Sequence, residues 1–284
     1  MKPVNIYAFA DEASPMIKGQ VAAMLRNHLQ GLEIRGVDDV NVSDISLAKA
    51  KEVRKVLDDA GLITWSIGSP IGKIMIDGDH KTHIEKFRRT LEIAETLGAK
   101  NIRLFSYYIK EGEDPTQYKN AVMDRMAELL SYGKDFSVRL CHENEKGIYG
   151  DNATRCKELL DSFPNLYGIF DPANFVQCGQ NTLEAWALLK DRIFYMHIKD
   201  AQADGTVVPA GYGEGHLPEI LSDFIARGGK DMTVEPHLQA FSGLQNLEQP
   251  KEDRKLGGQF HFKDHDESFD MACQSLRTVL SNIK

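Results

Sequence analysis

Four residues of kinds that bind metal ions each follow a short apolar stretch of the sequence. The apolar stretches occupy residues 138–141, 167–170, 193–196 and 231–234, and they lead to Glu143, Asp171, His197 and Glu235. Such stretches, bounded by glycine or proline, are typical of buried strands. Carboxylate oxygens and an imidazole suit a divalent cation such as Mn, Mg, Co or Zn. One such strand end would mean little, but four in succession indicate a metal site.

The size and charge of the chain limit the classes of protein to which it could belong. At 284 residues it has a normal length for one α/β barrel, so we predict a single domain over residues 1–284. The net charge of -8 argues against a general nucleic-acid binder. The sequence lacks a membrane-length apolar run, a signal-peptide core and any Cys-x-x-Cys pair. We therefore expect a cytoplasmic protein with reduced thiols and no membrane partner.

Apolar strands and amphipathic helices alternate along the whole chain. The expected strands lie at 4–9, 31–36, 62–67, 101–105, 138–143, 167–170, 193–197 and 231–235. The expected helices lie at about 15–29, 44–60 (capped by Asp44), 80–97, 115–132, 151–163, 181–189, 217–227 and 266–280. This alternation predicts an α/β fold, the (β/α)8 TIM barrel with a parallel eight-stranded barrel and outer helices. An open doubly wound sheet is the alternative, and the lack of nucleotide-binding glycine motifs gives it little support.

A barrel of this kind would bring the four metal-competent residues together. Side chains at the C-terminal ends of the strands point into one bowl, although the residues are far apart in sequence. Carboxylates crowded in a bowl repel one another, and a divalent ion relieves that repulsion. Taken singly, each residue could equally be a salt-bridged acid, a helix cap or a packed histidine. As a set, they favour a bound metal.

The residues around these four positions form motifs that resemble a known superfamily. The motifs are Cys-His-Glu-Asn-Glu at 141–145, Phe-Asp-Pro-Ala-Asn at 170–174, Met-His-Ile-Lys-Asp at 196–200 and Val-Glu-Pro-His at 234–237. They resemble the xylose isomerase-like TIM barrels, especially the sugar phosphate isomerase/epimerase branch. That superfamily includes ketose epimerases, hydroxypyruvate isomerases, inosose dehydratases and endonuclease-IV-type DNA repair enzymes.

The resemblance implies a metal centre and an acid–base pair. Glu143, Asp171, His197 and Glu235 would hold one divalent ion, with Mn or Zn favoured and Mg or Co as alternatives. Glu143 and Glu235 would also act as catalytic acid and base on opposite faces of a substrate carbon. Moving a proton next to a carbonyl requires such a pair, together with stabilisation of the enediolate oxygen. Each glutamate could act as a base only if one of its oxygens stays free of the metal.

Three polar residues near the motifs are candidates for binding substrate. Lys199 and His237 each lie two residues beyond a ligand, so an extended chain would point them to the same side. Asn174 stands where many members of the superfamily have a histidine. An amide can hydrogen-bond a hydroxyl but is a poor zinc ligand, which weakens both a three-metal repair site and the usual ketose epimerase.

Three further residues could line the bowl. Glu33 lies at the end of the second strand, where an ion pair is the alternative role. Trp65 and Tyr107 could form an apolar wall against a sugar, although aromatic residues more often pack in a core.

The residues therefore favour a divalent-metal-dependent isomerase or epimerase of a sugar, sugar phosphate or polyol-derived ketone. A dehydratase or other lyase is the main alternative, because the same enolate can expel a β-hydroxyl group. An endonuclease-IV-type repair enzyme and a non-catalytic binding barrel are less favoured. We expect a small carbohydrate substrate and no nucleic-acid partner, and a homo-oligomer stays open. The polar segment 238–262 could cover the site, touch a neighbouring subunit or form a surface excursion.

Overall fold

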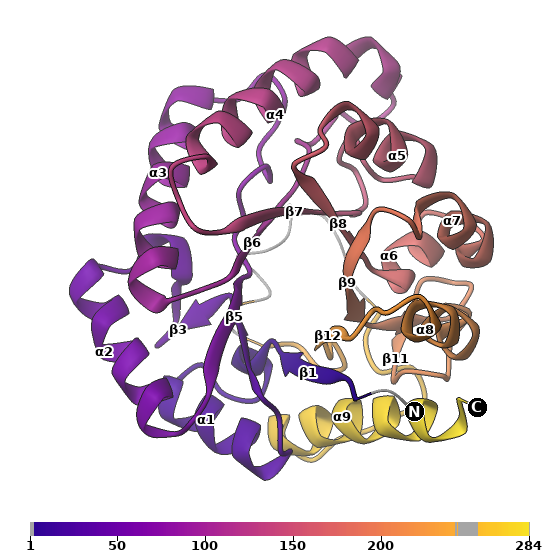
Figure 1. Ribbon diagram of the computed structural model, residues 1–284. Coiled ribbons are helices and arrows are strands. Elements are labelled where there is room, and N and C mark those ends of the chain that lie inside the picture. The colour runs from indigo at the N-terminus through magenta and orange to yellow at the C-terminus, as the bar shows by residue number, and fades with distance from the viewer. Residues whose placement is uncertain (1–2, 242, 244–254, 284) are drawn as a thin grey trace.

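Eight parallel strands form a closed barrel in the computed structural model, which describes residues 3–241, 243 and 255–283. The barrel strands are β1 (Asn5–Ala8), β2 (Gly31–Ile34), β5 (Ile63–Ile67), β6 (Asn101–Leu104), β7 (Arg139–Glu143), β8 (Leu166–Phe170), β9 (Ile193–Ile198) and β12 (Asp231–Val234). They pair in sequence order, and β12 closes the barrel against β1 (Figure 1). The predicted (β/α)8 fold is confirmed, and the open sheet is excluded.

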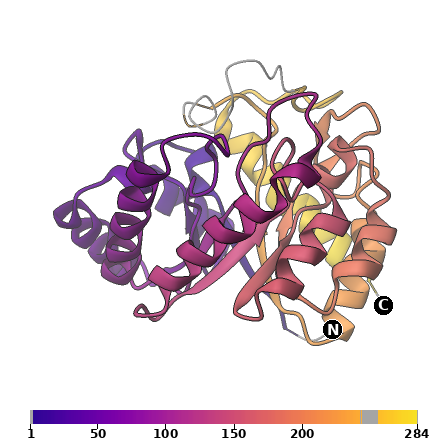
Figure 2. The same ribbon diagram turned by 90° about the horizontal axis from the view of Figure 1, so that it is seen from above.

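Helices surround the barrel. They are α1 (Ile17–Arg26), α2 (Leu47–Asp59), α3 (His80–Leu97), α4 (Lys119–Gly133), α5 (Ala153–Ser162), α6 (Pro172–Gln177), α7 (Thr182–Leu189), α8 (Leu217–Ala226) and α9 (His265–Asn282). Figure 1 shows them as an outer ring around the strands, and the view in Figure 2 shows them packed alongside the barrel. The connection after each strand therefore returns over the outside of the barrel, as the strand–helix alternation predicts.

The structure differs locally from the expected elements in the start of one helix and in several short helices and strands. The Ser46 side chain, and not that of Asp44, caps α2 by accepting the Lys49 N–H group. The sequence did not predict α6 or the two-residue pairs β3 (Gly36–Val37) with β4 (Val40–Asn41) and β10 (Asp200–Ala201) with β11 (Val207–Val208). Elements this short have too few residues to show a helical or strand periodicity.

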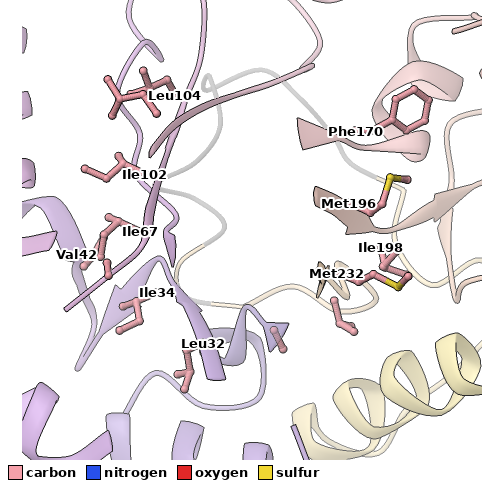
Figure 3. Packing of buried hydrophobic residues seen from close by; sticks show 14 of the residues in the cluster. Leu32, Ile34, Val42, Ile67, Ile102, Leu104, Phe170, Met196, Ile198 and Met232 are labelled. Carbon is pink, nitrogen blue, oxygen red and sulfur yellow. The ribbon is translucent and has the colours of Figure 1, made fainter. Parts of the chain in front are cut away.

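The strands alternate between an apolar outer face and a largely polar inner face. In β9, Met196 and Ile198 belong to the apolar cluster between strands and helices, part of which Figure 3 shows. Tyr195 and His197 face inward, where both contact Glu33 of β2. Since successive side chains of a strand point to opposite faces, the outer cluster fixes which residues face the centre of the barrel.

Aromatic and apolar side chains fill the N-terminal end of the barrel interior. This cluster consists of Tyr7, Trp65, Cys141, Ile169 and Tyr195. The rings of Tyr7 and Trp65 stack with their centroids 4.4 Å apart. This layer fills the lower part of the barrel, and the polar side chains that contact His197 lie above it, towards the C-terminal ends of the strands.

A buried histidine on α3 holds the loop that follows β5. The Nε2 atom of His83 accepts a hydrogen bond of 2.8 Å from the Gly72 N–H group. Burial, together with the positive charges of nearby residues such as Lys86, lowers the pKa of His83 to about 4. The neutral imidazole is therefore the form that the fold accommodates.

We expect the His83→Gln variant to lose part of the dependence of stability on pH. In the wild type, the unfolded chain takes up a proton near pH 6.5, whereas folded His83 does so only near pH 4. Stability should therefore fall as the pH drops through this window, by up to about 1.4 kcal/mol per pH unit for this group. Glutamine can still accept from Gly72, but it does not titrate.

Urea unfolding of both proteins between pH 7 and pH 4 measures the difference. The exposed His261→Gln variant serves as the control and should follow the wild type. Parallel curves for wild type and His83→Gln would contradict the prediction.

Candidate metal and acid–base site

The four residues predicted as metal ligands converge at the C-terminal end of the barrel. Their ligand atoms all lie within 4.8 Å of one another, and all four side chains are buried. Glu143 ends β7, Asp171 follows β8, His197 lies in β9 and Glu235 follows β12. Parallel pairing of these strands brings the residues together across 92 positions of sequence, from 143 to 235.

His197 connects two carboxylates through its two ring nitrogens. Its Nδ1 atom lies 2.8 Å from Glu143 Oε1, and its Nε2 atom lies 3.1 Å from Glu33 Oε2. Burial alone would lower the pKa of His197, but the charges of Glu143 and Glu33 outweigh it and raise the pKa to about 10. His197 with this raised pKa carries a proton on Nδ1, and a cation that bound at Nδ1 would have to replace the Nδ1 proton.

Asp171 offers one carboxylate oxygen to the centre of the cluster. Its Oδ1 atom accepts the Asn174 N–H group and so caps α6. Its Oδ2 atom is buried without a hydrogen-bond partner and lies 2.9 Å from the charged Nζ of Lys199. Burial raises the pKa of Asp171 to about 7 against the opposing effect of Lys199. Lys199 compensates the charge of this oxygen, and a carboxylate oxygen in this position could also bind a divalent cation.

The amide of Asn144 fixes the backbone of Asp171. Its Oδ1 atom accepts the Asp171 N–H group, and its Nδ2 atom donates to the Asp171 carbonyl, each at 2.9 Å. These paired bonds hold the end of β7 against the end of β8. Asn144 was not among the predicted site residues, although its place directly after Glu143 could have suggested it.

Two arginines in the barrel interior each hold one oxygen of a glutamate. Arg103 Nη1 donates to Glu143 Oε2, and Arg35 Nη1 donates to Glu235 Oε1, both at 3.1 Å. The other oxygens face inward: Glu143 Oε1 towards His197, and Glu235 Oε2 towards Lys199 at 2.9 Å. Burial raises the pKa of Glu235, but Lys199 and the cations around it hold that pKa well below its usual range.

Arg35 is itself enclosed by acids and aromatic rings. It donates two hydrogen bonds to Asp11 and one to Glu12, both of which follow β1. Its guanidinium lies between the rings of Phe9 and Phe241, 4.5 and 4.7 Å from their centroids. Sequence reasoning placed Arg35 either in the lining of the bowl or in an ion pair with Glu33 or a helix, and it gave no role to Asp11 or Glu12. Their position after a strand was the signal available.

Three of the predicted substrate-binding residues lie at the cluster. Lys199 contacts both Asp171 and Glu235. The Nδ2 atom of Asn174 lies 3.5 Å from Glu143 Oε1, and its buried Oδ1 atom has no hydrogen-bond partner. His237 Nε2 lies 3.6 Å from Glu235 Oε1, on the side that faces Arg35.

The structure does not bring the other three predicted substrate-binding residues into the bowl. Both oxygens of Glu33 are occupied by hydrogen bonds beneath His197, and Trp65 lies in the closed lower layer. Tyr107 is fully buried outside the barrel, against His80 and His83 of α3. Trp65 is the single extra residue of β5, where the register with β2 shifts, and it faces the barrel interior in this lower layer.

The segment 238–262 contacts the site at its beginning. Leu238 and Phe241 are buried, and Phe241 covers Arg35. Residues 242 and 244–254 lie outside the described part of the chain, so the predicted roles of this segment stay predictions.

The cluster fits a divalent cation. Three carboxylates and one imidazole converge within a distance that one ion can span, and Asp171 Oδ2 is left without a hydrogen bond. This donor set is typical of Mn, Zn, Mg and Co sites. Glu143, Asp171, His197 and Glu235 are the residues that would hold it.

Comparison with known families agrees with this architecture. The sequence model of the xylose isomerase-like TIM barrel matches residues 22–255. The chain belongs to this family. No curated protein sequence matches it significantly.

None of the helices in the described residues is long and apolar enough to cross a membrane.

Solved structures share the fold at low sequence identity. A structure of the IOLI protein with a bound zinc atom has a TM-score of 0.73 at 16% identity, covering 99% of each chain. A structure of D-psicose 3-epimerase in the presence of D-fructose has a TM-score of 0.71 at 16% identity. The match covers 96% of this chain and 97% of the epimerase chain. The probable 3-DHS dehydratase AsbF from Bacillus anthracis has a TM-score of 0.72 at 15% identity. The match covers 97% of this chain and 98% of the AsbF chain. At such identities the likeness shows the fold.

We expect the Asp171→Asn variant to bind divalent metal at least roughly 100-fold more weakly than wild type. Loss of a residue that only hydrogen-bonds a metal ligand weakens binding by about 10- to 100-fold, and loss of a ligand's charge should cost at least as much. The asparagine oxygen can still cap α6, so the local fold should persist while the charge at the Oδ2 position is lost. Titration calorimetry with Mn²⁺ measures the affinity. Glu145→Gln is the control, because Glu145 pairs with Lys73 outside the four-residue cluster. Equal affinity of Asp171→Asn and wild type would exclude Asp171 as a ligand.

Proposed function

We propose that this xylose isomerase-like barrel is a divalent-metal-dependent isomerase or epimerase. It would act on a sugar, a sugar phosphate or a polyol-derived ketone by moving a proton on the carbon next to a carbonyl. The observation that carries the proposal is the paired arrangement of Glu143 and Glu235. Each has one oxygen held by an arginine and the other turned towards the shared cluster.

The arginines give the glutamates a defined orientation. Since Arg103 and Arg35 each occupy one oxygen from the barrel interior, each carboxylate cannot turn freely. A carboxylate fixed in this way can accept a proton from a substrate carbon without first reorganising, which is how preorganised groups lower a barrier. One glutamate on each side of the carbon would remove and return the proton. A Mn or Zn ion bound by the four ligands would polarise the carbonyl and stabilise the enediolate charge.

Two further residues are placed to orient substrate. Asn174 has a buried carbonyl oxygen without a hydrogen-bond partner, which can accept from a sugar hydroxyl group. Lys199 can donate to a substrate oxygen once a cation takes over the neutralisation of Asp171 and Glu235. Elimination of a β-hydroxyl group from the same enediolate would give a dehydratase instead.

The Glu143→Gln and Glu235→Gln variants should each lose solvent-deuterium incorporation into substrate, because glutamine cannot take up the proton. The wild-type protein, loaded with Mn²⁺ or Zn²⁺, is first screened in deuterated water with ketoses, sugar phosphates and inososes. Mass spectrometry follows the label, and saturating metal is used to offset the lost ligand charge. Glu145→Gln should incorporate deuterium at the wild-type rate.

The product distinguishes the reactions. A deuterated epimer or isomer supports the proposal, whereas loss of water assigns the enzyme as a dehydratase. Undiminished incorporation in both glutamine variants would refute the acid–base roles.

The Lys199→Met variant should separate substrate binding from metal binding. The Lys199 ammonium group lies 2.9 Å from both Asp171 Oδ2 and Glu235 Oε2, so it competes with a cation for the same oxygens. Its removal should leave metal affinity unchanged or higher while raising KM or lowering kcat. Calorimetry with Mn²⁺ and steady-state kinetics measure the two effects. Weaker metal binding with unchanged kinetic constants would assign Lys199 a structural role.

A further inference from the structure

Glu33 lies directly beneath the cluster, on the opposite side of His197 from Glu143. Its Oε2 atom is 3.1 Å from His197 Nε2, while Glu143 Oε1 is 2.8 Å from His197 Nδ1. The imidazole is fully buried between them. Only Nδ1 is directed at Glu143, Asp171 and Glu235, because Glu33 occupies the other nitrogen.

Neighbouring strands hold the Glu33 carboxylate in place. Ser66 of β5 and Tyr195 of β9 donate to its Oε1 atom at 3.1 and 2.9 Å. Thr233 of β12 donates to its Oε2 atom at 2.9 Å. Both oxygens therefore have hydrogen-bond partners, and the residue is 1% exposed. A sugar cannot reach this carboxylate, which corrects the expectation that Glu33 binds substrate.

We propose that Glu33 is a positioning residue that fixes the His197 ring so that Nδ1 alone faces the metal cluster. The inference rests on the proposed metal site. If Nδ1 bound a cation, the remaining ring proton would lie on Nε2, which could donate it to Glu33 Oε2. A carboxylate in this place fixes the tautomer and orientation of the ring and makes the ligating nitrogen more basic.

The surroundings explain why an uncharged acceptor would not be equivalent. The hydroxyl groups of Ser66, Tyr195 and Thr233 all donate to the buried Glu33 carboxylate and favour its charged form. A negative charge at this depth therefore acts on His197 in a medium of low dielectric constant, where its effect is strong. Phe9 packs edge-on against the imidazole at 5.2 Å and leaves the ring little freedom to turn.

The first test measures the affinity of the full-length protein for Mn²⁺ by titration calorimetry. In Glu33→Gln, the amide oxygen can still face His197 and the amide nitrogen can face Ser66 and Tyr195, so the shape is kept and the charge is lost. We expect about 10- to 100-fold weaker binding, the usual loss for such an outer partner. Glu145→Gln is the control and should stay close to wild type, because Glu145 pairs with Lys73 outside the four-residue cluster.

The second test needs no variant and is unaffected by misfolding. Long-range ¹⁵N–¹H spectra of the zinc-loaded wild type report which nitrogen of His197 carries the proton. A proton on Nε2 supports the inference. A proton on Nδ1, or wild-type affinity in a folded Glu33→Gln protein, would overturn it.

These measurements use no substrate, so they separate this inference from the proposed reaction. A protein that binds zinc through Nδ1 with weakened binding in Glu33→Gln, yet exchanges no deuterium into any sugar, would retain the positioning role and lose the proposed function. Deuterium exchange into a sugar, together with unchanged metal affinity in Glu33→Gln, would retain the proposed function and remove the positioning role.

Discussion

The centre of this protein depends on the compensation of charges buried inside a barrel. Around the four ligands the described residues include the carboxylates of Asp11, Glu12, Glu33, Glu143, Asp171 and Glu235 and the permanent cations of Arg35, Arg103 and Lys199. An uncompensated buried charge costs several kcal/mol, so each of these groups needs a partner. The ion pairs of the barrel interior supply these partners, and they define the orientation of each ligand side chain.

The carboxylates divide into two kinds according to their partners. Glu33 and Asp11 have both oxygens occupied by hydrogen bonds, so their role is to hold His197 and Arg35. Glu143 and Glu235 each have one oxygen held by an arginine, and Asp171 has one oxygen committed to a helix cap. The second oxygen of each of these three faces the cluster. This difference is the physical basis for assigning Glu33 and Asp11 to holding other side chains, and Glu143, Asp171 and Glu235 to binding a metal or substrate.

The barrel makes this arrangement possible because its two ends differ. Stacked aromatic rings close the lower end, and the apolar outer faces of the strands pack on the helices. The charged groups around the four ligands occupy the upper part of the interior, next to the C-terminal ends of the strands, where barrels of this fold place their active sites. The start of segment 238–262 adds Phe241 as an aromatic cover over Arg35.

Sequence alone determined the barrel and the four converging residues. Apolar strands and amphipathic helices in regular alternation have few compatible folds, and the C-terminal ends of parallel strands must meet. Lys199 was also identified correctly as a neighbour of the ligands, because its spacing from His197 follows the period of an extended chain. These are local patterns whose consequences follow from geometry common to all such barrels.

Only the tertiary structure decided which polar residues support the ligands and which face the bowl. Glu33 and Arg35 are both inward-facing at β2, yet one lies under His197 and the other reaches Glu235 across the barrel. Trp65 stacks on Tyr7 in the lower layer of the barrel, and Tyr107 packs against α3. Height within the barrel and contacts between distant strands decide these roles, because pairing between residues some 200 positions apart leaves no periodic mark in the sequence.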